Sequence, residues 1–194
     1  MVAAAVETRA RCLLRGTLGC PICEAEFPLV DGVVTFDAQP EPAAPTRPER
    51  RSDEPGERTM RLAAFLDLTT PGGIVAVGGA WDDALDGLLD LTDLRALVLE
   101  PTASWRPREP FGAVRGGGVP VAAGSVRGVA LDARTAGPAH VEAAVRALQP
   151  RGRLVAPAAT PLPEGVRELA RDAEHWVAER EGGVTSELVP LRRG

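Results

Sequence analysis

The sequence contains no lysine, no asparagine and no tyrosine, and only 4% of its residues are aromatic. All 22 basic residues are therefore arginines, which we attribute to a coding bias rather than to a selected arginine surface. Positive charge is not in excess, because the net charge is -5 at pH 7. This balance argues against a protein that coats nucleic acid.

Long apolar runs are also missing, and cysteine is scarce. Charged residues begin at Glu7, so the amino-terminal stretch fits neither a signal peptide nor a membrane-spanning helix. We therefore expect a cytoplasmic protein without a membrane partner. In that reducing compartment, the 3 cysteines favour a metal site or free thiols over a disulfide framework.

The chain divides at a segment rich in proline and charge. With 194 residues, 44% of them apolar, it can bury one substantial core and a small appendage. Residues 37–58 contain almost no large apolar side chain, which predicts an extended or disordered linker. The linker separates a head, residues 1–36, from a body, residues 59–194.

Strand and helix patterns alternate along the body. Strands are predicted at 74–79, 95–101, 126–132 and 153–158, and helices at 59–68, 81–91, 139–148 and 163–173. Two further strands joined at Gly182 and Gly183 predict a closing hairpin. This order predicts an α/β fold, a Rossmann-like open and mostly parallel sheet with helices on both faces and a C-terminal antiparallel hairpin.

The first predicted strand of the body ends in Gly78 and Gly79, which permit close approach of a ligand to the backbone. The helix that follows presents free N–H groups and the positive end of its dipole. Asp82 and Asp83 in its first turn would repel a pyrophosphate. A ligand that carries ammonium and sulfonium charge is therefore favoured over a dinucleotide.

The body resembles the class I S-adenosylmethionine-dependent methyltransferases, in a shortened form. The stretches that carry the resemblance are "GGIVAVGGAW", "LVLEP", "VPVAAGSVRGVALD" and "VRALQPRGRLVAPA". It implies S-adenosylmethionine as cofactor, with Gly78, Gly79 and Glu100 in the binding site. Glu100 lies about 20 residues past the glycines, where a carboxylate can accept both ribose hydroxyls. The alternative is an acid that merely ends a strand in solvent.

The sequence also departs from that family. Trp81 stands where a small residue usually lets the cofactor lie against the backbone, and Arg115 and Arg127 stand where the family commonly has acids. Asp132 is the one carboxylate left near the expected transfer site, as a candidate catalytic residue or as an exposed structural acid. Methyl transfer needs placement more than a base, so the missing acids affect the cofactor pocket most.

The head contains the turn "CPIC", with Cys20 and Cys23, followed by a predicted hairpin. It resembles half of the zinc ribbon in small activator subunits of methyltransferases, in which each such turn gives two thiolates to zinc. Cys12 would supply a third thiolate, and Glu24, Glu26, solvent or a protein partner bound through the knuckle would supply a fourth. A redox pair and a hairpin that has lost its metal are the alternatives.

Three functional classes follow from these observations. The first is an active methyltransferase acting on RNA, protein or a small molecule. The second is a methyltransferase-like protein with weakened or lost catalysis that serves as a binding or regulatory module. The third is a metal-handling or redox protein led by Cys20 and Cys23. The altered positions Trp81, Arg115 and Arg127 favour the second class.

Overall fold

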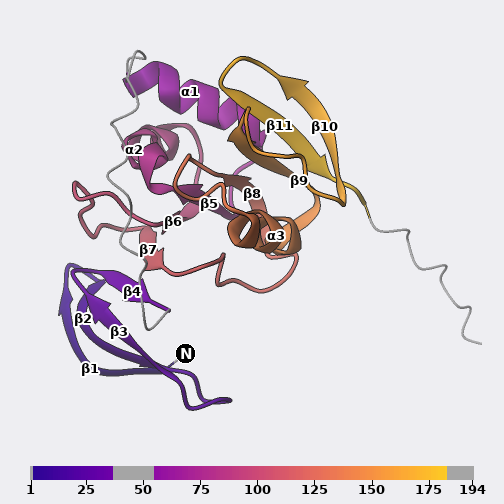
Figure 1. Cartoon of the computed structure of the whole chain (residues 1–194). Helices are drawn as coiled ribbons and strands as arrows, with labels where there is room; N and C mark the ends of the chain where they lie inside the picture. Colours follow the sequence, from indigo (N-terminus) through magenta and orange to yellow (C-terminus); the bar gives the residue numbers. More distant parts are fainter. Residues whose placement is uncertain (1, 37–54, 183–194) are drawn as a thin grey trace, which may run out of the picture.

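The computed structural model describes residues 2–36 and 55–182 (Figure 1). The predicted linker, 37–58, falls mostly outside these ranges. Its last residues do not belong to a linker, because helix α1 (Pro55–Leu66) begins at Pro55. Proline is well suited to the first turn of a helix, where its missing N–H would have no partner in any case.

One 11-stranded sheet runs through the described part of the chain, in the order β1-β2-β3-β4-β7-β6-β5-β8-β9-β11-β10. Its strands are β1 (Val2–Arg9), β2 (Cys12–Gly19), β3 (Glu26–Val30), β4 (Val33–Thr35), β5 (Ile74–Gly78), β6 (Arg95–Leu99), β7 (Phe111–Arg115), β8 (Val126–Ala130), β9 (Leu148–Pro157), β10 (Val166–Arg171) and β11 (His175–Arg180). The remaining elements are α1, a single 3-10 turn η1 (Gly79–Trp81), α2 (Asp82–Leu91) and α3 (Pro138–Ala147).

The strands of the body follow the predicted Rossmann-like pattern. Neighbouring strands pair in parallel from β7 through β6, β5 and β8 to β9. β11 then pairs antiparallel with both β9 and β10. If the strands of the body are numbered 1 to 7 along the chain, from β5 to β11, their order across the sheet is 3-2-1-4-5-7-6. The chain changes direction across the sheet between β5 and β8, which is where open α/β sheets bind ligands.

One prediction near the end of the body is wrong. The predicted helix at 163–173 is strand β10, and it forms the antiparallel hairpin with β11. Val166, Leu169 and Ala170 are spaced as on a helix face, but only Val166 is buried. The hairpin of β10 and β11 was not predicted. The predicted hairpin across Gly182 and Gly183 needs a strand after Gly183, which lies outside the described residues. Strand β7 was not predicted.

Helices cover both faces of the sheet, as predicted (Figure 1). On one face α1 and α2 bring Leu62, Leu85 and Leu88 against the strands, each completely buried. On the other face α3 brings Val141 and Ala144. Burying one such leucine contributes about 1.5–3 kcal/mol, so these contacts fix the sheet from both sides.

The head joins the same sheet. Its strands β1 to β4 are antiparallel, and the predicted hairpin of β3 and β4 turns at Asp31 and Gly32, both with positive φ. Strand β4 pairs in parallel with β7, with Val33 opposite Ala113. The head thus extends the sheet of the body. No helix in the described ranges is long and apolar enough to span a membrane.

Candidate functional site

Three adjacent strands of the body bring the predicted site residues to one edge of the sheet. Gly78 ends β5, Glu100 follows β6, and Asp132 comes shortly after β8. The three strands are parallel, so their carboxyl ends meet at the same edge. The sequence prediction that these residues share one site is consistent with this geometry, although the contacts they make there are with other parts of the chain.

Gly79 lies against the backbone that follows β6. A Cβ atom at this position would collide with the carbonyl oxygen of Glu100 and would lie 3.0 Å from the backbone nitrogen of Thr102. Only glycine allows two backbones to approach so closely. The space that Gly79 provides is therefore used by the chain itself.

Gly78 is packed in the same way against the end of β8. A Cβ atom there would lie 2.6 Å from Cγ of Asp132 and 2.7 Å from Oγ1 of Thr135. Asp132 is only 3% exposed, and Thr135 is completely buried. The sequence alternative of an exposed strand-end acid is therefore wrong for Asp132, which is a buried carboxylate.

The Asp132 carboxylate is fully engaged in hydrogen bonds. Its Oδ2 accepts the N–H of Ala80 at 2.8 Å. Its Oδ1 accepts the N–H groups of Arg134 and Thr135 and the hydroxyl of Thr135, each at 2.9 Å. This arrangement ties the glycine turn after β5 to the loop after β8. The Asp132 carboxylate thus acts as a structural clamp between these two loops.

Glu100 is also committed to the protein. Its Oε1 accepts the N–H of Gly116 at 2.7 Å, and its own N–H donates to the carbonyl oxygen of Val114 at 2.9 Å. Its φ of 49° lies in the left-handed region, where a non-glycine residue stores about 1 kcal/mol or more of strain. The interactions of Glu100 hold together the ends of β6 and β7.

The acids in the first turn of α2 are paired with arginines. Asp82 accepts a hydrogen bond from Arg108 at 2.8 Å, and Arg108 also donates to Asp86 at 2.8 Å. Asp83 lies 3.4 Å from Arg58. These pairs agree with the predicted preference of the helix dipole for acids, and they leave the helix end unsuited to a pyrophosphate.

Two of the positions that depart from the methyltransferase family, Trp81 and Arg127, have structural roles in the fold. Trp81 is buried beneath α1 and α2, with its Nε1 donating to the carbonyl oxygen of Leu131 at 3.3 Å. Arg127 lies at the start of β8 and donates to the carbonyl oxygens of Thr70 and Gly72. The Trp81 side chain is therefore part of the core, where it is 3% exposed.

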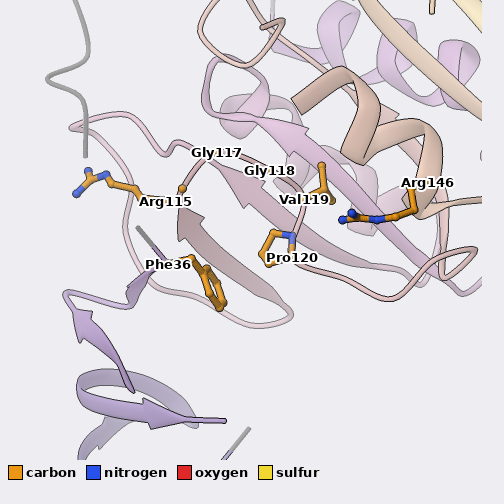
Figure 2. A pocket seen from close by; sticks show the side chains of 8 residues that line it. Phe36, Arg115, Gly117, Gly118, Val119, Pro120 and Arg146 are labelled. Atoms are coloured by element: carbon orange, nitrogen blue, oxygen red, sulfur yellow. The ribbon is translucent and has the colours of Figure 1, made fainter. Parts of the chain in front are cut away.

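Arg115 ends β7 and lines a small pocket of about 190 Å³ (Figure 2). Phe36, the glycine loop 116–118 and Pro120 form the rest of the wall, together with Val119 and Arg146. Figure 2 shows the Arg115 side chain pointing away from the other lining residues, whereas Arg146 reaches toward Val119 and Pro120. The two guanidinium groups therefore do not converge on one ligand.

The CPIC turn has the geometry of a thiolate site. The N–H of Cys20 donates to the carbonyl oxygen of Ala25, and the N–H of Glu24 donates to the carbonyl oxygen of Cys20, both at 2.9 Å. The backbone N–H groups of Cys23 and Ile22, followed by the thiol of Cys23, donate to the Cys20 sulfur and lower the pKa of Cys20. These donors stabilise the thiolate.

Cys12 does not join this turn. It begins β2, whereas Cys20 follows the last residue of the same strand. A strand rises about 3.3 Å per residue, so the two cysteines lie roughly 26 Å apart along β2. Within residues 2–36 and 55–182, no three His, Cys, Asp or Glu side chains are grouped to hold a metal ion. The hypothesis that Cys12 supplies a third thiolate in this chain conflicts with the extended strand.

His175 begins β11, and its side chain is half-buried. Its ring centroid lies 5.3 Å from that of Trp81 and 6.0 Å from that of Phe65. Burial, followed by the positive charge of Arg61, lowers the pKa of His175. The residue therefore belongs to the contact between α1 and β11, which the sequence pattern did not indicate.

No family model matches the sequence, and no curated protein matches it. Solved structures do resemble it. One is from the complex of the Haloferax volcanii Trm112 methyltransferase activator with a methyltransferase: identity 20%, TM-score 0.42, covering 51% of this chain and 50% of that one. Another is an S-adenosyl-L-methionine methyltransferase from Silicibacter pomeroyi. Its sequence identity is 15% and its TM-score is 0.42, and the match covers 65% of this chain and 94% of that one.

A third resemblance is to a 16S rRNA methyltransferase from T. thermophilus in complex with AdoMet and guanosine. The sequence identity is 18% and the TM-score is 0.39, and the match covers 92% of this chain and 47% of that one. This chain spans about half the length of the Haloferax protein. At such identities a likeness concerns the fold. The assignment of a Rossmann-like fold stands on the strand order of the sheet itself.

Proposed function

We propose that this protein is a methyltransferase-like module that has weakened or lost catalysis and acts by binding or regulation. The observation that carries the proposal is the hydrogen bond from the Ala80 N–H to the Asp132 carboxylate, 2.8 Å long. This bond uses the backbone N–H of the turn after β5, where the fold would bind a ligand. An internal carboxylate there takes the place that an anionic group of the ligand would need.

S-adenosylmethionine fits the strand-end residues only if they rearrange. Its carboxylate would compete with Asp132 for the Ala80 N–H, and its ribose would have to share the Glu100 carboxylate with the N–H of Gly116. Each buried group left without its partner costs about 1–3 kcal/mol. Gly79, which could admit the ligand, is already in contact with the backbone at Glu100. These costs oppose binding and support the proposal.

Thermal unfolding with and without ligand tests this function. A cofactor bound with a Kd of 10 μM would add about 3 kcal/mol of stability at 2 mM, which raises the Tm of a protein of this size by roughly 6–12 °C. We expect a shift below about 1 °C with either S-adenosylmethionine or S-adenosylhomocysteine. A shift of several degrees would refute the proposal.

An active S-adenosylmethionine-dependent methyltransferase is the second candidate. The specific observation in its favour is that Glu100 and the Gly78–Gly79 turn share one edge of the sheet, as a ribose-binding acid and a glycine loop require. If this candidate is correct, Glu100→Ala should weaken cofactor binding at least tenfold, since it removes two charge-assisted hydrogen bonds. Ligand binding that Glu100→Ala leaves unchanged would exclude it.

For the head we propose a protein partner and zinc at Cys20 and Cys23. Ile22, at the tip of the turn between them, is 93% exposed, and an exposed apolar side chain beside a metal turn suits a contact with another protein. Two thiolates fill half of a tetrahedral zinc site, so the partner would provide the other ligands. Elemental analysis of the protein alone should find less than one zinc per chain. Zinc content that is unaffected by Cys23→Ser would contradict this assignment.

The third class, a redox protein, uses the same two thiols. Both cysteines are free and belong to one tight turn, so a disulfide between them is the bond that a redox protein would use. Mass spectrometry after equilibration with oxidised and reduced glutathione separates the two uses. A disulfide that persists in excess reduced glutathione would favour the redox class over zinc.

A further inference from the structure

A cavity of about 560 Å³ lies between α3 and the connection from β9 to β10. One wall is a face of α3, because the lining positions are spaced as one stripe of a helix. The other wall is the connection between β9 and β10. The lining residues are Ala136, Pro138, Val141, Glu142, Val145, Arg146, Thr160, Pro161, Leu162, Pro163, Glu164 and Arg180. We call this cavity the α3 groove.

The α3 groove lies where the sheet has little cover. In the described part of the chain, α3 is the one helix that contributes to the core on this face. Residues 158–165 connect β9 to β10 without a helix, and Leu162 in this connection is 40% exposed. Pro161 and Pro163 fix their own φ angles and thereby hold the second wall in place. The groove is therefore a preformed apolar surface.

Two acidic side chains at the groove have no partner among the described residues. Within the described ranges, neither Glu142 nor Glu164 makes an ion pair or a side-chain hydrogen bond. Arg180 has its guanidinium directed at the carbonyl oxygen of Leu148. Arg146 is the one basic side chain of the lining that has no such bond. An apolar segment with more than one basic residue would complement both the floor and the carboxylates.

We propose that the α3 groove binds the C-terminal segment of this same chain, residues 183–194. The described chain ends at Gly182, two positions beyond Arg180, and the N–H of Glu181 donates to the carbonyl oxygen of Gly165 at 3.1 Å. The segment therefore begins beside one end of the groove. Its sequence combines the complementary features, which are Val184, Leu188, Val189, Leu191, Arg192 and Arg193.

The segment has more than enough reach. Extended, residues 183–194 span up to about 40 Å, whereas the lining stretch of α3 from Pro138 to Arg146 rises only about 12 Å. A covalently attached segment also acts at an effective concentration in the millimolar range, so modest contacts are sufficient. Docking would cover the apolar floor and pair the free carboxylates with Arg192 and Arg193.

Hydrogen exchange on the full-length protein tests the proposal. The backbone amides of residues 184–189 and of Leu191 should exchange at least tenfold more slowly than in a synthetic peptide of the same sequence. Leu188→Asp combined with Leu191→Asp should abolish this protection and accelerate exchange at 160–165. Asp90→Arg, an exposed change on α2 on the opposite face, serves as the matched control and should change neither.

Charge exchange provides a second readout that does not depend on the apolar contacts. One variant reverses the charges of the groove (Glu142→Arg with Glu164→Arg), and another reverses the charges of the segment (Arg192→Glu with Arg193→Glu). Each should reduce the protection of the segment's amides from exchange severalfold. Combining all four substitutions should restore it, since the charges are again complementary.

Two results would overturn the proposal. One is exchange of residues 184–191 in the unmodified protein at the rate of the free peptide. The other is protection that rises as the protein is concentrated from 1 to 100 μM, because the occupant would then be the segment of a second copy.

Discussion

Replacing Asp132 by alanine should destabilise the fold, because this carboxylate acts as a clamp. The substitution removes four acceptor contacts, made to the N–H groups of Ala80, Arg134 and Thr135 and to the Thr135 hydroxyl. Hydrogen bonds to a charged group contribute about 1.5–3 kcal/mol each, and water can replace some of these contacts. We expect a loss of about 3–5 kcal/mol in the free energy of unfolding.

Urea denaturation followed by tryptophan fluorescence measures this loss, since Trp81, Trp105 and Trp176 are all buried. Asp132→Asn keeps one acceptor oxygen, but its amide NH2 group then faces an N–H that needs an acceptor. The free energy of unfolding should therefore lie between that of the unmodified protein and that of Asp132→Ala. Asp90→Ala, on the exposed side of α2, should stay within about 0.5 kcal/mol of the unmodified protein. A change of less than 0.5 kcal/mol for Asp132→Ala would refute the clamp and return Asp132 to the candidate catalytic residues.

Three further predictions follow from the structure. Glu100→Ala should cost about 1–3 kcal/mol in urea denaturation, because it leaves the Gly116 N–H without its charged partner; an unchanged stability would show that this bond is replaceable. Stability should fall as the pH drops below about 6.5 toward the lowered folded-state pKa of His175, since the unfolded state binds the proton first, and His175→Gln should remove this pH dependence of the urea midpoint. Iodoacetamide at pH 7 should modify Cys20 faster than Cys12, as followed by mass spectrometry, because hydrogen bonds lower the pKa of Cys20; equal rates would contradict this.

Much of the body could be predicted from periodicity. The apolar runs of β5, β6 and β8 mark strands buried on both faces, and α2 and α3 carry clear helical stripes. Strand β10 could not be predicted in this way, because its apolar spacing imitates a helix and only its pairing with β11 decides its conformation.

The position of the candidate site could be predicted from the sequence, but the contacts that its residues make could not. Parallel strands bring their carboxyl ends together, so the neighbourhood of Gly78, Glu100 and Asp132 followed from the strand order. The burial of Asp132 depends on a contact with Ala80, 52 positions earlier in the chain, which no local pattern reveals. For Cys12 the local chain extends as a strand instead of folding back, and this separates it from the CPIC turn.

Isothermal titration of S-adenosylmethionine into the full-length protein tests the central claim most directly. If Asp132 and the contact between Gly79 and Glu100 close the strand-end site, the titration should give no saturable heat, which places the Kd above about 1 mM, weaker than about -4 kcal/mol. Saturable binding with a Kd in the micromolar range would contradict the claim and would make the protein a cofactor-binding methyltransferase candidate.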